Sequence, residues 1–417
     1  MKLYHRSLSL LLLAVTAPLH AQDPAIAPNR IRDLISSRRD ALPEGDARAR
    51  LDKILGNPAE FRAQILLGEV VEVEGKKKLV RTGWRDDAEY FYPASTVKLC
   101  GAVAALERVN ELRRGTEPGL METTPLAFHP SRRSKEFLAD DPTNLEGAKI
   151  TLQHLIRRVF LVSDNDAFNR LYDFCGQNWL NRRMWRAGLD TVRISHRLSV
   201  ALSKNDNKYT PIVELRYPEG PRLLGEDWGT ENLDLQNFGH GVYVGKSHYA
   251  DGEKIKHPMS FFLKNAMSLA DLQTCLARIV RPDIVFEKGE PFDLTEAQRA
   301  LLLDALSTYP GDSKNPLYDR AKFPDEYCKF FLSGLARVVP KERLKVYSKV
   351  GNAYGFVVDT SYVVDSATDR GFFLAAAVYA NSDGVVNDDK YDEESVAFPW
   401  LADVAEIVAR DVWKQAK

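Results

Sequence analysis

A serine and a lysine three residues apart stand in the most chemically informative stretch of the chain. Ser95 and Lys98 lie in segment 92–106, which is otherwise almost entirely apolar. Pro93 allows a helix to begin near Ser95, and the i to i+3 spacing then puts both side chains on one face. Burial disfavours a charged lysine and so frees a neutral amine to act as a base. The pair predicts a serine nucleophile at the positive end of a helix, with its own base.

A lysine that snorkels from a partly exposed helix is the simpler alternative. The S-x-x-K pattern occurs once in the chain, however, and no carboxylate follows Lys98 until Glu107. Both features favour the chemical interpretation.

Two further motifs follow in the chain. Ser163-Asp164-Asn165 comes directly after an amphipathic helix, and Lys349-Val350-Gly351 ends an expected strand and precedes Asn352. Taken singly, the first could be a helix cap and the second could contain an ordinary edge-strand lysine. Their order in the chain after Ser95 favours instead a shared role in one catalytic site.

The order S-x-x-K, S-D-N, K-[TS]-G is typical of the class A β-lactamases and penicillin-binding proteins. The chain resembles this superfamily of serine hydrolases from about residue 64 to its C-terminus. Segments 188–193 and 267–272 are similar to the family's approach to its omega loop and to the helix before its last strands.

The resemblance implies a role for each motif residue. Ser95 would attack a carbonyl and become acylated, and Lys98 would take its proton. Ser163 would pass a proton to the leaving nitrogen, and Asn165 would hold Lys98 and the substrate amide. Lys349 would supply positive potential for Ser163 and for a substrate carboxylate.

The resemblance also implies a site for the developing oxyanion. The backbone N–H groups of Ser95 and Asn352 would donate to it, and Gly351 would let substrate backbone approach the strand edge. The family has Thr or Ser where this chain has Val350. Recognition of a carboxylate must therefore depend more on Lys349 or on an insertion.

A second departure concerns hydrolysis of the acyl-enzyme. Class A β-lactamases carry a Glu in an E-x-x-L-N run, and that Glu activates the deacylating water. The matching run here has Ser199 at the Glu position and Ser203 at the Asn position. A serine is a poor general base near neutral pH, and nothing fixes the geometry of Glu214 or Glu219 as a replacement. We therefore expect slow deacylation.

The leading hypothesis is a serine hydrolase that acylates Ser95 with a β-lactam or a D-alanyl-type peptide and behaves like a penicillin-binding peptidase. A non-catalytic module that binds cell-wall peptide or a partner through the same groove is the alternative, and an esterase on this scaffold stays open. The expected partner is a small-molecule or peptidoglycan-peptide substrate, with no cofactor.

The chain has 417 residues, 44% hydrophobic and 28% charged, with a formal net charge of −1. Because no basic stripe or polybasic run stands out, we expect no nucleic acid and no anionic membrane as partner. Lys2 and Arg6 precede the apolar segment 8–15 and small residues up to Ala21, which is the order of a secretory signal peptide. We expect a periplasmic or secreted protein without a later membrane span; a buried N-terminal helix is the alternative.

Four cysteines in an oxidising compartment allow three full pairings, between which the sequence does not choose. They are Cys100, Cys175, Cys275 and Cys328. Cys100 lies in the apolar segment, which favours a free core thiol. His240, His248 and His257 share one Gly-rich stretch but lack the spacing of metal ligands, so we expect no metal.

Apolar periodicity and turn residues place the elements that must position these motifs. Helices are expected in 29–55, from 95 onward, and in 151–161, 268–279, 295–307 and 399–414; strands are expected in 64–73, 78–84, 344–349, 355–364 and 371–380. Strands near both ends and helices between them predict a two-lobed α+β fold. One antiparallel sheet, built from N- and C-terminal strands and flanked by helices, would stand beside an all-helical lobe.

The expected organisation has three parts: a signal peptide in 1–21, a helical segment in 22–60 and a catalytic domain in 61–417. Residues from about 205 to 258 are rich in Gly, Asp, Asn and Pro. So long a weakly periodic segment predicts an insertion that acts as a lid, a binding loop or mobile decoration.

Overall fold

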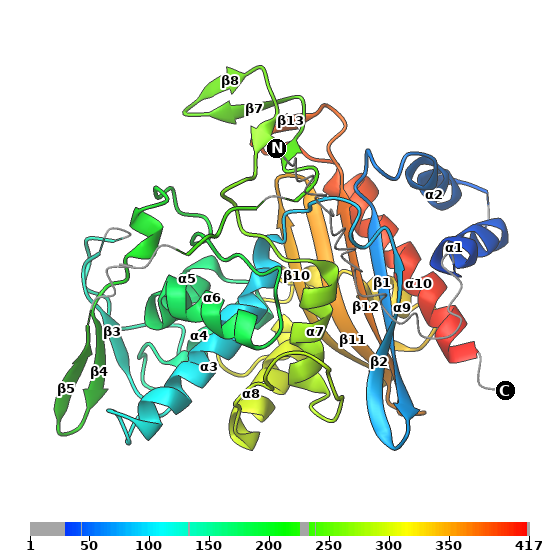
Figure 1. Ribbon diagram of the computed structural model, residues 1–417. Helices are drawn as coiled ribbons and strands as arrows, with labels where there is room; N and C mark the ends of the chain where they lie inside the picture. The colour runs from blue at the N-terminus through cyan, green and yellow to red at the C-terminus, as the bar shows by residue number, and fades with distance from the viewer. Residues whose placement is uncertain (1–29, 43, 132–133, 226–232, 238, 415–417) are drawn as a thin grey trace, which may run out of the picture.

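The computed structural model describes residues 30–414 apart from 43, 132–133, 226–232 and 238. The predicted signal peptide lies outside these residues. A five-stranded sheet in the order β10-β11-β12-β1-β2 forms one half of the molecule, and every neighbouring pair is antiparallel. A helical lobe stands beside it (Figure 1). This is the two-lobed mixed architecture that the sequence predicted.

The helices surround the sheet and fill the second lobe. They are α1 (Arg30–Ala41), α2 (Asp46–Gly56), α3 (Lys98–Arg114), α4 (Leu152–Leu161), α5 (Asn165–Cys175), α6 (Gln177–Arg186), α7 (Leu269–Val280), α8 (Glu296–Ser307), α9 (Leu332–Leu335) and α10 (Phe398–Lys414). A 3₁₀ turn, η1 (Ala94–Val97), precedes α3, and a π-helical turn, η6 (Glu393–Ala397), precedes α10.

In the part of the chain that the structure describes, the strands form one large sheet and three small ones. They are β1 (Gln64–Val73), β2 (Lys76–Trp84), β3 (Leu126–Phe128), β4 (Val213–Tyr217), β5 (Gly220–Leu224), β6 (Tyr243–Val244), β7 (Ser247–Ala250), β8 (Glu253–Ile255), β9 (Met259–Ser260), β10 (Leu344–Ala353), β11 (Phe356–Asp365), β12 (Arg370–Tyr379) and β13 (Val385–Val386).

The large sheet is buried on both faces, and β12 shows why its sequence is continuously apolar. Phe373 and Ala375 pack in the core shared with the helical lobe. Phe372 and Leu374 point the other way, into the core formed with α1, α2, α9 and α10. In Figure 1 the terminal helices α1, α2 and α10 lie on one side of the sheet while α3 to α6 lie in the other lobe. A strand between two cores needs apolar residues at every position.

The predicted elements are present, with two corrections near the motifs. The strand expected in 344–349 continues to Ala353, because the whole stretch pairs with β11 from Leu344↔Asp365 to Ala353↔Phe356. Lys349 therefore lies inside a strand rather than at its end. The regular helix begins at Lys98, and Ser95 lies in the preceding 3₁₀ turn.

The insertion is built from short strands in its described parts. Strands β4 and β5 extend β3 into a three-stranded antiparallel sheet at the far end of the helical lobe. Strands β7 and β8 join β13, and β6 pairs with β9. Figure 1 shows β7 and β8 above the end of the large sheet where β13 lies. Within the described residues, no helix is long and apolar enough to cross a membrane.

Candidate active site

Ser95 and Lys98 lie at the junction between the sheet and the helical lobe. The turn η1 is held by Thr96, whose Oγ1 donates to the Pro93 carbonyl at 2.6 Å. Helix α3 starts at Lys98 and runs through the larger core, with residues 98–107 all buried. The apolar sequence thus makes α3 a buried helix, and its first residue carries the amine into the site.

The Lys98 side chain is completely buried, with an exposed fraction of 0%. Its Nζ lies 2.9 Å from Ser95 Oγ, 2.7 Å from Asn165 Oδ1 and 3.2 Å from Ser163 Oγ. It also contacts the Ser163 carbonyl oxygen. Burial, and next the charge of Lys349, hold the pKa of Lys98 well below its ordinary value.

The lowered pKa of Lys98 favours a neutral amine, and these contacts accommodate one. An uncharged Lys98 has two N–H groups to donate and one lone pair that can accept. Donation to Asn165 Oδ1 and to the Ser163 carbonyl leaves the lone pair free for the Ser95 hydroxyl proton. The arrangement can therefore raise the nucleophilicity of Ser95 Oγ.

Ser163 lies in the loop between α4 and α5 and adopts a left-handed backbone conformation with φ of 56°. Asp164 caps α5 by accepting from the backbone N–H of Ala167 at 2.8 Å. The helix-cap interpretation of the motif is thus correct for Asp164. The residues on either side of it, Ser163 and Asn165, both reach Lys98.

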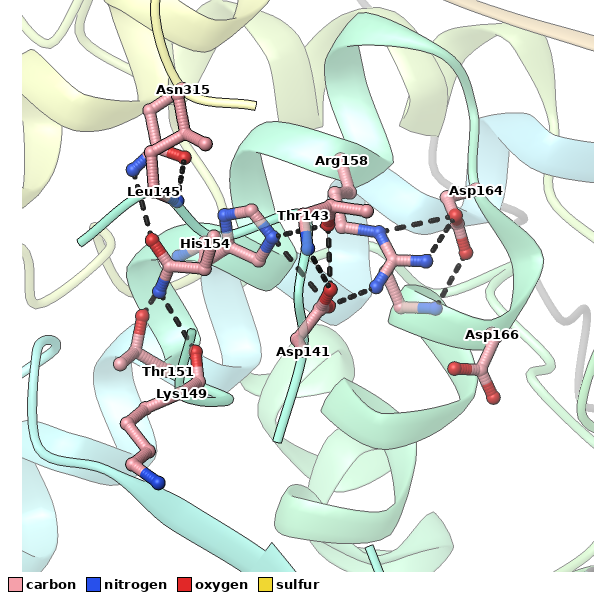
Figure 2. A network of polar contacts seen from close by, with 12 residues as sticks. Asp141, Thr143, Leu145, Lys149, Thr151, His154, Arg158, Asp164, Asp166 and Asn315 are labelled. Atoms are coloured by element: carbon pink, nitrogen blue, oxygen red, sulfur yellow. Dashed lines mark hydrogen bonds and ion pairs between the residues drawn. The ribbon is translucent and has the colours of Figure 1, made fainter. Parts of the chain in front are cut away.

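A polar network around Arg158 and Asp141 holds Asp164, in the loop between α4 and α5, as Figure 2 shows. Arg158 on α4 donates to Asp164 Oδ2 from Nη2 at 2.6 Å and forms an ion pair with Asp141. Asp141 in turn accepts from Thr143 at 2.6 Å and lies 3.5 Å from His154. Burial raises the pKa of Asp141, but hydrogen bonds from His154 and Thr143 and the charge of Arg158 outweigh it and keep the carboxylate ionised. Because the network holds Asp164, it also fixes the position of the adjacent Ser163.

Lys349 approaches from β10 and completes the cluster. It is fully buried, and its Nζ donates to Ser163 Oγ at 2.8 Å and to the Val350 carbonyl at 2.9 Å. Burial lowers its pKa to about 8, against the opposing charges of Cys328 and Asp359. Ser163 Oγ thus lies between two lysines, and their mutual repulsion favours a state in which only one of them is charged.

A third buried lysine, Lys329, lies close to this cluster without joining it. Lys329 is 2% exposed, and its Nζ donates to the Leu306 carbonyl at 2.6 Å. Burial lowers its pKa to about 8 as well. Asp359, opposite Val350 in the β10–β11 register, is also buried and accepts hydrogen bonds from two serine hydroxyls, Ser348 and Ser361.

Gly351 explains how β10 can lie against the serine turn. A Cβ at this position would be 2.5 Å from the Pro93 carbonyl oxygen and 3.0 Å from Ser95 N. Only glycine permits this approach without a shift of backbone. Asn352 follows directly and lines the same cavity as Ser95.

Two cavities meet at the cluster. One, of about 730 Å³, extends toward Arg337, and the other, of about 640 Å³, extends toward Ser199. Four residues line both of them: Ser95, Asn165, Asn352 and Glu393. Ser95 is therefore open to a ligand that extends to either side.

Sequence reasoning missed Glu393. Its carboxylate accepts a hydrogen bond from Asn352 Nδ2 at 3.0 Å, and burial raises its pKa. It lies in the π-helical turn η6, and a π-turn is often found at functional sites. Glu393 comes 41 positions after Asn352 and has no motif around it, so the sequence carried no signal for this contact.

The run aligned with the omega loop lies beside Asn165. Ser199 Oγ accepts from Asn165 Nδ2 at 2.7 Å, and Ser203 donates to Asp206 at 2.6 Å. Arg197 is buried and anchors the loop through Asp173. Glu214 is in β4, where it contacts His129 and Arg216 instead of the cavities around Ser95.

The four cysteines are buried and free of disulfide bonds in the structure. Among the residues that the structure describes, no group of three or more His, Cys, Asp or Glu side chains could hold a metal ion. The seven site residues predicted from sequence all lie in this one cluster: Ser95, Lys98, Ser163, Asn165, Lys349, Gly351 and Asn352.

Comparison with known proteins gives a family match and several solved structures. Residues 81–215 match the model of the β-lactamase enzyme family, whereas no sequence match was found among curated proteins. A β-lactamase from Desulfarculus baarsii is 16% identical, with a TM-score of 0.48 and coverage of 94% of this chain and 100% of that one. A β-lactamase from Xanthomonas campestris is 16% identical, with a TM-score of 0.45 and coverage of 93% and 98%.

A mutant of PBP-A, solved as its acyl-enzyme complex with penicillin G, is 15% identical, with a TM-score of 0.48 and coverage of 92% and 97%. The family match spans Ser95, Lys98 and the Ser163-Asp164-Asn165 motif, while Lys349 lies beyond it. Over residues 81–215 the chain is thus similar to the β-lactamase enzyme family, as its motifs predicted.

Proposed function

We propose that the protein is a secreted serine hydrolase that forms an acyl-enzyme on Ser95 with a β-lactam or a D-alanyl-type peptide. One observation carries the proposal. The Nζ of Lys98 is fully buried, has a strongly lowered pKa and lies 2.9 Å from Ser95 Oγ. A buried amine beside a hydroxyl is a general base ready to accept a proton at neutral pH.

In the proposed acylation, Lys98 Nζ takes the hydroxyl proton as Ser95 Oγ forms a bond to the substrate carbonyl carbon. The oxyanion accepts hydrogen bonds from the backbone N–H groups of Ser95 and Asn352, each worth a few kcal/mol. The C–N bond then breaks, and the proton passes from Lys98 through Ser163 Oγ to the leaving nitrogen. Lys349, 2.8 Å from Ser163 Oγ, orients that hydroxyl and supplies positive potential.

Deacylation is the slow step in this proposal. Ser199 stands where class A enzymes carry their glutamate, and its hydroxyl is already bound to Asn165 Nδ2. It cannot accept a proton from water near neutral pH. A lactam adduct, whose expelled amine stays tethered to the acyl group, should therefore persist on Ser95.

Intact-mass spectrometry after mixing with penicillin tests the proposal. The expected result is a mass increase of one penicillin per chain that decays slowly, and no increase for Ser95→Ala. Labelling that survives Ser95→Ala would remove Ser95 from the mechanism. A folded wild-type chain that takes no label from penicillin or from a chromogenic ester would instead indicate a binding module without acyl chemistry.

A further inference from the structure

The two cavities that meet at Ser95 receive different sides of a substrate. Ser163 lines the cavity that extends toward Arg337 and not the other, whereas Ser199 lines the other and not this one. In the proposed acylation, Ser163 gives its proton to the leaving nitrogen, so that nitrogen must lie on the side of the first cavity. The group attached to the nitrogen therefore extends into this cavity of about 730 Å³, which we call the leaving-group cavity.

The wall of the leaving-group cavity combines aromatic rings with carboxylates. The rings of Phe330 and Phe398 have centroids 4.6 Å apart, and Tyr327 lines the cavity with them. Three glutamates line it as well: Glu326 in the 3₁₀ turn η4 (Asp325–Cys328), and Glu393 and Glu394 in η6. The face of an aromatic ring and a carboxylate both attract a cation. The two kinds of side chain together are therefore suited to a positively charged group.

The negative charge of these glutamates is not matched by the protein. Within the part of the chain that the structure describes, none of the three forms an ion pair. Glu393 instead accepts a hydrogen bond at 3.0 Å from Asn352, a neutral amide. Burial raises the pKa of Glu393 against this hydrogen bond, and the charge of Glu394 raises it further. A cation in the cavity would relieve the repulsion between the two carboxylates.

The same cavity is poorly suited to a carboxylate. Among the described residues that line it, Arg337 is the only cation, and its Nη1 already donates to Asp403 at 3.0 Å and to Glu406 at 3.1 Å. Lys349 is fully buried and does not line the cavity. Val350, which does line it, replaces the hydroxyl residue of the family. A carboxylate on the leaving group would thus meet three like charges and one guanidinium that is already paired.

We infer that the leaving group of the natural substrate carries an ammonium group in place of the free carboxylate of a C-terminal D-alanine. The cation would lie in the leaving-group cavity, against the aromatic rings and the glutamates. This inference rests on the proposed function of Ser95 and names the leaving group of that reaction. It assigns Glu326 and Glu394 as specificity-determining residues. Because both are exposed, salt should screen their effect on a bound cation.

Three thioesters of N-acetyl-D-alanine that differ only in the thiol test this inference. Thiocholine carries a cation, 3,3-dimethylbutanethiol is its neutral isostere, and 3-mercaptopropionate carries an anion. On acylation, Ser95 Oγ forms a bond to the carbonyl carbon, the C–S bond breaks, and the thiol leaves with the serine proton. A thiol reagent measures its release. Each rate is divided by the rate of the same thioester with hydroxylamine, which removes differences in intrinsic reactivity.

For the wild type, we expect the relative rate of the cationic thioester to be at least about fivefold higher than that of the neutral one, and the anionic thioester to be slower than both. A fivefold ratio corresponds to about 1 kcal/mol. An increase in salt from about 0.05 M to about 0.5 M should lower the cation-to-neutral ratio, because the Debye length shortens severalfold over this range.

The double variant Glu326→Gln/Glu394→Gln removes two charges with little change of shape and should lower the cation-to-neutral ratio at least threefold. The matched control is Glu253→Gln/Glu342→Gln, because both of these glutamates are exposed and line neither cavity; its ratio should equal that of the wild type. Equal relative rates for the cationic and neutral thioesters would overturn the inference, as would the same ratio in both double variants. If no thioester releases thiol and no acyl group is found on Ser95, the function of Ser95 itself is refuted instead.

Discussion

Replacement of Lys98 by methionine tests the base that the proposed mechanism requires. Met has a similar length and no amine, so it keeps the packing at the start of α3 and removes the contact to Ser95 Oγ at 2.9 Å. General-base catalysis contributes about 10²–10⁴-fold, which corresponds to about 3–5 kcal/mol at 1.36 kcal/mol for each factor of ten. The rate of penicillin labelling at pH 7 should fall by that factor.

Lys329→Met is the matched control for this variant. Lys329 is also a buried lysine with a lowered pKa, but its Nζ donates to the Leu306 carbonyl, away from Ser95. Both variants remove a buried amine and leave a carbonyl acceptor without that donor. Thermal unfolding will show whether both are folded, and only Lys98→Met should lose labelling. If Lys98→Met keeps more than a tenth of the wild-type rate, or if both variants lose it equally, the assignment of the base is wrong.

The pH dependence of penicillin labelling in the wild type is a second test of Lys98 as the base. A charged Lys98 cannot accept a proton, so the labelling rate should rise with pH only through the pKa of Lys98. Because that pKa lies well below 10.5, the labelling rate should stop rising well below pH 10.5. A lysine with its ordinary pKa of about 10.5 would instead give about a tenfold rise in rate for each pH unit between 7 and 9. Such a rise would contradict the burial argument.

Three further predictions concern other parts of the cluster. The labelling rate should fall as the pH rises through about 8, where Lys349 loses its charge. In Lys349→Met this fall should be absent, and the labelling rate at pH values below 8 should be lower than that of the wild type. Ser199→Glu should shorten the lifetime of the penicillin adduct at least tenfold by supplying a base for water, whereas Ser199→Gln should leave it unchanged; mass spectra of pre-formed adduct over time measure both. Gly351→Ala should slow labelling about 5- to 150-fold, since forcing a methyl group against backbone costs about 1–3 kcal/mol, and Gly225→Ala, with open space around its Cα, should not.

The local sequence was sufficient to predict the elements that carry the motifs, because each motif lies in a segment with a strong pattern of its own. The seven residues proposed for the site lie together in the structure. The apolar run after Lys98 predicted burial of its amine, and the structure confirms an exposed fraction of 0%. The apolar stretch of β12 predicted a central strand, and it lies between β11 and β1. In both cases the environment of a residue follows from its immediate neighbours.

The rest depended on contacts between distant segments. Nothing near Lys349 indicated that pairing with β11 would extend its strand to Ala353. Glu393 reaches Asn352 only because η6 returns to the end of β10. Likewise, the insertion has weak periodicity because its short strands are stabilised by partners elsewhere, such as β3 and β13. Such contacts leave no pattern within one segment.

The position of Ser163 between two lysines gives the proposed acylation its direction. Before reaction, repulsion and burial favour one charge on the pair Lys98 and Lys349. When Lys98 takes the proton of Ser95, two buried ammonium groups face the same Ser163 oxygen, at 3.2 and 2.8 Å. That state is costly in a low-dielectric site, so the proton is driven onward through Ser163 to the leaving nitrogen.

Since the return of the proton to Ser95 would reverse the attack, a Lys349→Met enzyme should form the tetrahedral intermediate but partition back to substrate more often. A larger nitrogen isotope effect on release of the leaving amine from a peptide substrate in that variant would support this account, and an unchanged effect would contradict it.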